Sequence, residues 1–296
     1  NEIHHNPYGV VIANSAGTDV GAILGVMNEI EQNEKDGILI ETSSRIEIGG
    51  NYVKSNQENG IRVSSCQPEA GQENGILNNI IRENQGHGIH PQNTKGTQIG
   101  EPGADVNTIS YNTGNGIHVD QCTSATDPGT PLNTIINNSI KDDNNHGVFL
   151  LGSRFTLVQD NEIRANYKNG IHLRASMFNQ IHGNEDVAEN GWHGVYMSHN
   201  SQQNDIAGNR IVDNKMAGIF VKESHYNFIP VGGGEPNTIE ENDEDGIRID
   251  AGIHNTIRKN IIRENGRDGL RLSDAHYNEV LGEITIERNE GHGIYL

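Results

Sequence analysis

The stretch NGIHLRASMFNQIHGN at 169–184 raises the question of the fold. It mixes glycine and asparagine, which disfavour helices, with isolated aliphatic residues that are too sparse for an ordinary buried strand. Related stretches recur elsewhere, including NEIEQNEKDGILI at 28–40, NYVKSNQENGIRV at 51–63 and NIIRENGRDGLRL at 260–272. They share the pattern N-x-I-x-x-N-x-x-x-G-(aliphatic)-x-(aliphatic). The sequence is therefore an array of short repeats.

Each copy of the repeat carries one glycine that is followed by Ile, Val or Leu. Apolar and polar residues alternate within a copy, and a period of two indicates strands. A repeat of about 24 residues cannot close a core alone, but stacked copies bury a continuous aliphatic column. The sequence predicts an all-β, single-stranded parallel β-helix of about twelve coils, with three short strands per coil, in one domain over 1–296. The repeat glycines are Gly9, Gly37, Gly60, Gly88, Gly116, Gly147, Gly170, Gly194, Gly218, Gly246, Gly269 and Gly293.

An asparagine stands four residues before most of these glycines, and Asp143 takes that place in the sixth copy. Asparagine tolerates left-handed turn geometry and bonds to local backbone groups. Stacked in register, asparagine side chains also pair from coil to coil. We therefore interpret these residues as turn and ladder residues rather than as a functional site. They are Asn33, Asn56, Asn84, Asn112, Asn166, Asn190, Asn214, Asn242, Asn265 and Asn289.

The composition excludes some function classes. A net charge of -19 makes the chain a poor general binder of nucleic acid. No run approaches the roughly 18 apolar residues of a membrane span. Cys66 and Cys122 fall two coils apart, about 10 Å in regular geometry, so we expect free thiols rather than a disulfide.

The array starts and stops inside a repeat, without a visible capping segment. We therefore expect exposed strand edges at 1–12 and 291–296, and a segment of a longer chain that can associate end to end or edge to edge. Longer copies place loops at 91–107, 121–133 and 230–237. The first two follow adjacent copies, and we expect them to project from one edge and wall one groove.

The repeat, as in GIHLRASMFNQIHGN, resembles the right-handed parallel β-helix repeats of the pectin-lyase-like superfamily, especially the NosD-type repeats of carbohydrate-binding proteins and sugar hydrolases. The resemblance covers nearly the whole chain. It implies a right-handed helix and a carbohydrate-active protein outside the cytoplasm, in the extracellular space, at the cell surface or in the periplasm.

One residue of each repeat strand, the x of G-I-x-L, should point to solvent because its neighbours point inward. From the third copy on, this column holds only Arg, His, Phe and Tyr. It is either a stacked ladder on an exposed sheet or a polysaccharide track, where sugars pack on aromatic faces and cations meet carboxylates. The candidate binding residues, with one lysine of the next outward column, are His90, His118, Phe149, His172, Tyr196, Phe220, Lys222 and Arg248.

Three consecutive copies, HGIHPQ at 87–92, NGIHVDQ at 115–121 and NHGVFL at 145–150, resemble the mannuronan C-5 epimerases. The first coil of that family reads Tyr-Gly-Phe-Asp-Pro-His, so His87, His90 and Gln92 replace its Tyr, Asp and His. Asp120 and His146 match its next two positions. The resemblance implies a proton-transfer centre built from His87, Asp120 and His146, acting in epimerisation or cleavage.

A second resemblance concerns LRAS at 173–176, which is similar to the Leu-Arg-His-Gly strand of alginate and chondroitin lyases. It implies an acid role for Arg174. The acidic turn EENDEDGIRID at 240–250 is either a solvated turn or a calcium site, and no other cofactor or metal is expected.

Two functional hypotheses follow. The first is a β-helix that binds, and epimerises or cleaves, an acidic polysaccharide. The second is a non-catalytic structural or adhesive segment of a surface protein. The basic and aromatic column favours the first, whereas the homogeneous repeats favour the second.

Overall fold

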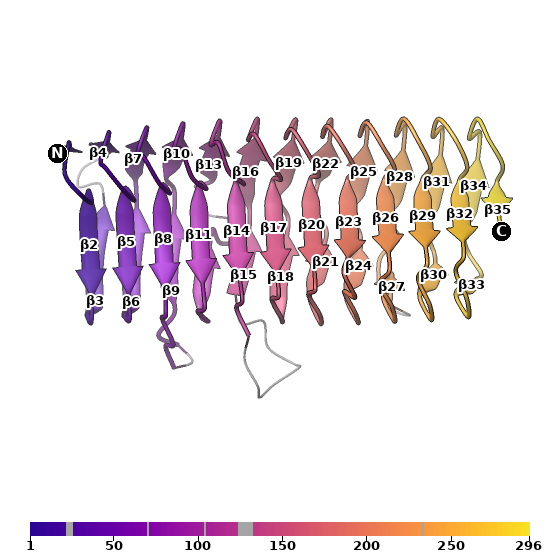
Figure 1. Ribbon diagram of the computed structural model, residues 1–296, viewed down its shortest axis with the longest axis horizontal. Coiled ribbons are helices and arrows are strands. Elements are labelled where there is room, and N and C mark those ends of the chain that lie inside the picture. The colour runs from indigo at the N-terminus through magenta and orange to yellow at the C-terminus, as the bar shows by residue number, and fades with distance from the viewer. Residues whose placement is uncertain (22–25, 70, 104, 124–132, 232–233) are drawn as a thin grey trace.

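The computed structural model describes residues 1–21, 26–69, 71–103, 105–123, 133–231 and 234–296. These residues form a solenoid of about twelve coils, and each complete coil visits three parallel sheets in the same order (Figure 1). They contain no helix, and hence none long and apolar enough to cross a membrane. The predicted all-β parallel β-helix with three strands per coil is confirmed.

The strands fall into three sheets, which we name A, B and C in the order in which a coil passes through them. Sheet A consists of β1 (Glu2–His4), β4 (Asn28–Glu31), β7 (Asn51–Lys54), β10 (Ile80–Arg82), β13 (Asn107–Ser110), β16 (Asn138–Lys141), β19 (Glu162–Arg164), β22 (Asp186–Ala188), β25 (Arg210–Val212), β28 (Thr238–Glu240), β31 (Ile261–Arg263) and β34 (Thr285–Glu287).

Sheet B lies along the front of the rod in Figure 1 and carries the repeat strands that follow each glycine. It consists of β2 (Val10–Ala13), β5 (Ile38–Glu41), β8 (Ile61–Ser64), β11 (Ile89–Gln92), β14 (Ile117–Asp120), β17 (Val148–Leu151), β20 (Ile171–Arg174), β23 (Val195–Ser198), β26 (Ile219–Lys222), β29 (Ile247–Asp250), β32 (Leu270–Ser273) and β35 (Ile294–Tyr295).

Sheet C completes each coil before the chain returns to sheet A. It consists of β3 (Ala16–Gly21), β6 (Ser44–Gly49), β9 (Asn74–Leu77), β12 (Thr97–Ile99), β15 (Asn133–Ile136), β18 (Thr156–Gln159), β21 (Gln180–His182), β24 (Asp205–Ala207), β27 (Phe228–Ile229), β30 (Thr256–Arg258) and β33 (Glu279–Leu281).

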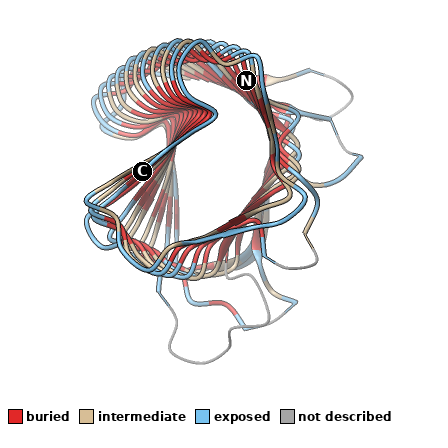
Figure 2. Cartoon of the chain, turned by 90° about the vertical axis from the view of Figure 1, so that its right-hand side faces the viewer, coloured by how far each residue is buried: buried red, intermediate tan, exposed pale blue. Residues whose placement is uncertain are grey.

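The core is a column of aliphatic side chains that line the inner wall of all three sheets. Figure 2 shows this view along the rod, with buried residues on the inside of the stacked coils and exposed residues outside. Within sheet B, Ile171 and Leu173 are fully buried, as the alternation predicts. Each coil therefore hides an apolar face that it could not bury alone.

The asparagines before the glycines form a buried ladder. Except in Asn289 of the last coil, the Nδ2 group donates to Oδ1 of the counterpart in the next coil, for example from Asn84 to Asn112 at 3.0 Å and from Asn214 to Asn242 at 2.9 Å. Most of these residues are completely buried. An unmade hydrogen bond in such a place costs about 1–3 kcal/mol, so the ladder fixes the register of the turns.

The cysteines and the terminal strands agree with expectation. Cys66 and Cys122 are free thiols buried in the core, and burial raises the pKa of Cys122 to about 12. The strands β1, β2 and β3 pair on one side only, as do β33, β34 and β35, and residues 291–296 are exposed. Of residues 1–12, only Ile12 is buried.

Contrary to the expectation, the two loops do not leave from one edge of the solenoid. The long part of the first insertion lies between β12 and β13, at the corner from sheet C to sheet A, whereas the second leaves between β14 and β15, at the corner from sheet B to sheet C. Adjacent copies thus insert residues at different corners of the coil. Residues 124–132 of the second loop lie outside the described residues.

Candidate functional site

The predicted outward column exists on sheet B, and its rings stack on one another. His118 aligns with Phe149, which aligns with His172, and the pairing continues to Tyr196 and Phe220. Consecutive ring centroids, beginning with His90 and His118, are separated by 4.8, 5.0, 4.9, 4.7 and 5.3 Å. We call these six residues the ring ladder.

None of the six rings is fully exposed, contrary to the prediction: four are half-buried, and two are buried. His172 and Phe220 retain only 8% and 9% of their accessible surface. Neighbouring rings cover their faces, and histidines of the preceding turn, His146 and His193, pack against them at centroid distances of 4.8 and 4.9 Å. The alternation of a strand indicates which side a residue faces, but not what covers it there.

The stacking changes how the ring ladder can meet a ligand. Each inner ring has another ring on both faces, so a sugar cannot pack on those faces as expected. Only ring edges point outward, and the edge of an aromatic ring carries the positive part of its quadrupole. At one end the guanidinium of Arg248 lies 5.0 Å from the centre of Phe220, and at the other Arg62 aligns with His90. The outer side of the ring ladder therefore suits the oxygen atoms of a ligand better than the apolar faces of sugar rings.

The histidines behind the ring ladder have tautomers that the backbone fixes. The N–H of Asn115 donates to Nδ1 of His87 at 2.9 Å, so the proton of the neutral His87 ring lies on Nε2. That Nε2 lies 2.9 Å from Nδ1 of His118, which must accept, and His118 therefore carries its own proton on Nε2. Burial lowers the pKa of His87 to about 3 and also lowers that of His118, so both rings are neutral at pH 7. We call this pair the first relay.

A second relay repeats this arrangement two coils further on. The N–H of Asn169 donates to Nδ1 of His146 at 3.2 Å, and Nε2 of His146 lies 3.3 Å from Nδ1 of His172. The proton of His172 is thus on Nε2, which donates to Oγ of Ser198 at 2.9 Å. Burial lowers the pKa of His146 to about 3 and that of His172 to about 2.

The first relay ends differently, in a set of buried polar atoms without partners in the described part of the chain. Nε2 of His118, Nε2 of His90, Oδ1 of Asp120 and Nε of Arg62 all lack a hydrogen bond. Gln92 connects two of these residues, since it accepts from Arg62 at 2.6 Å and donates to Asp120 at 3.1 Å. We call these five residues the polar cluster.

The polar cluster lies where sequence reasoning placed a proton-transfer centre, but it does not contain the expected set. His87 and His146 belong to different relays, and both nitrogens of each ring are already engaged. Of the three residues, only Asp120 keeps an unpartnered atom. Sequence reasoning did not include Arg62 and Gln92, although both stand in the outward columns, because their contact depends on the register of neighbouring coils.

The remaining cationic candidates lie further along sheet B. Arg174 is exposed, and its guanidinium lies 3.3 Å from Nε2 of His199. Lys222 is exposed as well. Arg248 is neutralised by Asp250 on the same strand, at 2.6 Å. The structure does not bring Arg174 to Asp120, since β17 separates their strands.

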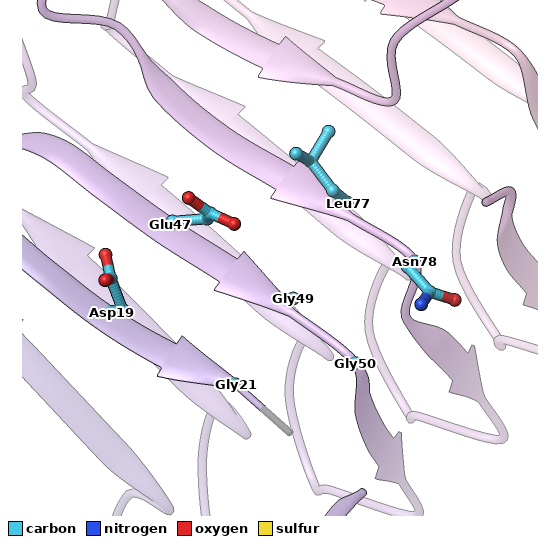
Figure 3. A pocket seen from close by; sticks show the side chains of 7 residues that line it. All are labelled: Asp19, Gly21, Glu47, Gly49, Gly50, Leu77 and Asn78. Carbon is cyan, nitrogen blue, oxygen red and sulfur yellow. The ribbon is translucent and has the colours of Figure 1, made fainter. Parts of the chain in front are cut away.

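Acidic residues gather at two further places. On the outer face of sheet C, Asp19 and Glu47 align on adjacent strands and line a pocket of about 540 Å³, which Gly21 and Gly49 keep open (Figure 3). In the acidic turn at 240–250, Glu240 pairs with Arg263 at 2.7 Å, and Asp243, Glu244 and Asp250 also pair with cations. Among the described residues, no group of three His, Cys, Asp or Glu side chains could hold a metal ion.

Comparison with known families agrees with the repeat and the coil geometry. Residues 1–101 and 103–230 match the family described as "Periplasmic copper-binding protein (NosD)". The chain belongs to the NosD family. Residues 184–296 match "Right handed beta helix region", which agrees with the predicted hand of the solenoid. No curated protein matches this NosD-family sequence significantly.

Solved structures share the fold at low identity. The mannuronan C-5 epimerase AlgE6 A-module of Azotobacter vinelandii is 15% identical, with a TM-score of 0.69 over 99% of this chain and 87% of that chain. The Dettilon tailspike protein is 14% identical, with a TM-score of 0.68 over 96% of this chain and 61% of that one. The AlgE4 A-module of A. vinelandii is 13% identical, with a TM-score of 0.50, over 95% and 90%. Identities this low establish the fold alone.

The family description names copper, and the described residues do not fit a copper site. Cysteine and methionine sulfur atoms favour copper, but both cysteines and one of the four methionines, Met197, lie in the hydrophobic core. The described residues also contain no group of three His, Cys, Asp or Glu side chains that could hold a metal ion. The nitrogens of His87 and His146 are engaged in the relays. Nε2 of His118 carries its proton and so has no lone pair for a metal. We derive no step through copper.

Proposed function

We propose that this NosD-family chain binds an acidic polysaccharide along the outer face of sheet B, with its tightest contacts at the polar cluster. The observation that carries this proposal is the set of buried polar atoms without partners. The N–H groups of His118 and Arg62 require an acceptor, and Oδ1 of Asp120 requires a donor. Each unmet atom costs about 1–3 kcal/mol, which a ligand that supplies the partner would recover.

An acidic polysaccharide has both kinds of group. Its carboxylates accept from the N–H donors, and its hydroxyls donate to Asp120. The ring edges along the ladder, together with Arg174 and Lys222, continue a face suited to oxygen over several coils. These N–H donors, ring edges and cations on sheet B matter because the net charge of -19 would otherwise repel a polyanion.

The names of similar proteins agree with this class of ligand. One solved relative is a mannuronan C-5 epimerase module, and the family description is periplasmic. We accordingly place the protein outside the cytoplasm. We propose binding rather than epimerisation or cleavage, because the pKa values of His87 and His146 near 3 leave neither ring poised for acid–base work at neutral pH.

One observation favours a second function, a purely structural rod. The faces of the inner rings of the ladder are covered by neighbouring rings, and the second relay is satisfied internally, as a stabilising ladder would be. The two functions differ in the polar cluster, because a structural rod gains nothing from polar atoms that are buried without a hydrogen-bond partner.

Calorimetric titration with uronate-containing and neutral polysaccharides tests the proposal. We expect saturable binding of an acidic polymer by the unaltered chain and a loss of about tenfold or more in Asp120→Ala, since a buried hydrogen bond to a charged group is removed. Glu41→Ala is the matched control, because Glu41 is an exposed acid in the same outward column. No binding of any acidic polymer would favour the structural rod. Equal affinities in all three proteins would contradict binding at the polar cluster.

A further inference from the structure

The described residues of the insertion at 230–237 lie beside the outer face of sheet C. The N–H of Val231 donates to Oδ1 of Asp205, and the carbonyl of Val231 accepts from the N–H of Gly234, both at 2.8 Å. The carbonyl of Glu235 accepts from the N–H of Gly208 at 3.0 Å. Val231, Gly234 and Glu235 thereby wall a pocket of about 560 Å³ over β21 and β24.

An orientated histidine lies in this pocket. Nε2 of His182 is 2.8 Å from Oδ2 of Asp205. Because a carboxylate only accepts, Nε2 carries a proton, and in the Nε2–H tautomer Nδ1 is an acceptor. Asp205 is held in place by His182 on one oxygen and by Val231 on the other, while 29% of the His182 side chain remains exposed. No hydrogen bond of Nδ1 occurs within the described residues, so this lone pair is available to a ligand.

The other walls define the chemistry of the ligand. Ala207 and Val231 contribute apolar surface, and Gln159 and Glu235 contribute an amide and a carboxylate. Gly183 and Gly208, at φ of 58° and 67°, turn the chain at the rim without side chains that would fill the space. The two carboxylates of Asp205 and Glu235 disfavour an anionic ligand. The pocket volume is within the usual range of small-molecule sites, about 300–1,000 Å³.

We propose that this pocket binds a neutral sugar unit. A sugar hydroxyl donates to Nδ1 of His182, other hydroxyls bond to Gln159 and Glu235, and the apolar face of the ring packs on Ala207 and Val231. The site lies on sheet C and shares no residue with the polar cluster on sheet B. The proposal therefore stands independently of acidic polysaccharide binding. Together the two proposals give the chain two separate carbohydrate sites, one for an acidic polymer and one for a neutral sugar.

Saturation-transfer difference NMR with neutral disaccharides of glucose, mannose and galactose, and with a uronate disaccharide, tests this site. We expect saturable binding of at least one neutral disaccharide and none of the uronate at the pocket. His182→Phe keeps a ring but removes the acceptor, and Glu235→Ala removes an exposed carboxylate without disturbing the core. Each change should weaken binding of the neutral sugar about tenfold.

Two controls separate this site from the rest of the surface. Gln98→Ala alters an outward residue of the same sheet away from the pocket and should leave the affinity unchanged. Asp120→Ala should also leave neutral sugar binding unchanged, even if it abolishes binding of acidic polymers. Neutral sugar binding that survives both His182→Phe and Glu235→Ala, binding of the uronate alone, or no saturable binding would overturn the proposal.

Discussion

The two histidine relays on sheet B begin alike and end differently. In both, a backbone N–H fixes the first histidine, which donates to the second. The second relay then closes on Ser198, whereas the first stops at Nε2 of His118, which has no partner among the described residues. In a repeat fold, a candidate binding site therefore lies where a hydrogen-bond pattern that is complete in other coils lacks a partner.

The largest effect on the free energy of unfolding should come from low pH, because it protonates the buried histidines of both relays. The pKa values of His87, His90 and His146 are near 3 in the folded protein, against about 6.5 for an unperturbed histidine, because burial disfavours the charged ring. The unfolded chain therefore binds more protons at mildly acidic pH. Folding free energy from these groups is complete above about pH 6.5 and is lost as the pH falls toward 3.

Urea unfolding at pH 7, 5 and 4 measures this loss. One pKa unit corresponds to about 1.4 kcal/mol, so several buried histidines should together lower the free energy of unfolding by several kcal/mol at pH 4. His4 is exposed and offers a matched control, since His4→Gln should not alter the acid sensitivity. A stability that is flat between pH 7 and 4 would show that the relays already carry charge at neutral pH.

A buried polar atom without a hydrogen-bond partner does not always mark a binding site, as Asp143 shows. It stands in the asparagine ladder, where Oδ1 accepts from Asn112 but Oδ2 has no partner. In every other copy from Asn33 to Asn265 an amide nitrogen at this place donates to the next coil. Burial raises the pKa of Asp143 to about 7, so its contribution to stability is present below about pH 4 and is lost as the pH rises through 7. The side chain is 1% exposed, and no ligand can reach it.

Asp143→Asn should therefore stabilise the protein, because it restores the missing donor. We expect a gain of about 3 kcal/mol at pH 8, where the folded wild-type carboxylate is charged, and little difference at pH 4, where it is protonated. Thermal unfolding of both proteins at the two pH values measures the difference. Asn144→Asp places a carboxylate on a neighbouring exposed residue and should show no such dependence.

A smaller effect on stability is expected when the hydrogen bond from His172 to Ser198, which ends the second relay, is removed. Ser198→Ala leaves the buried N–H of His172 without its acceptor and should lower the free energy of unfolding by about 1–2 kcal/mol. Ser64→Ala, at the same place of the repeat on β8, should change it by less than about 0.5 kcal/mol. Urea unfolding compares the two variants. Equal effects would mean that the closure at Ser198 contributes nothing.

The sequence predicted the architecture well, because the period of the aliphatic residues and the glycine of each copy depend on local geometry. It also placed Asp120, His118 and His90 on one face. It did not predict the burial of His172 and Phe220, since alternation assigns a face but not the stacking of neighbouring rings. It misplaced the loops because adjacent insertions leave from different corners of the coil. The bridge from Arg62 through Gln92 to Asp120 depends on exact side-chain contacts that no pattern of residue types contains.

The ring nitrogens of His118 and His172 allow the most direct test of an open site. We expect that, in nitrogen-15 NMR spectra, titration with an acidic oligosaccharide shifts the Nε2–H signal of His118, which acquires an acceptor. The corresponding signal of His172 should stay in place, because Ser198 already accepts its proton. A shift of His172 equal to that of His118, or no shift of either under conditions where the sugar binds, would contradict the account.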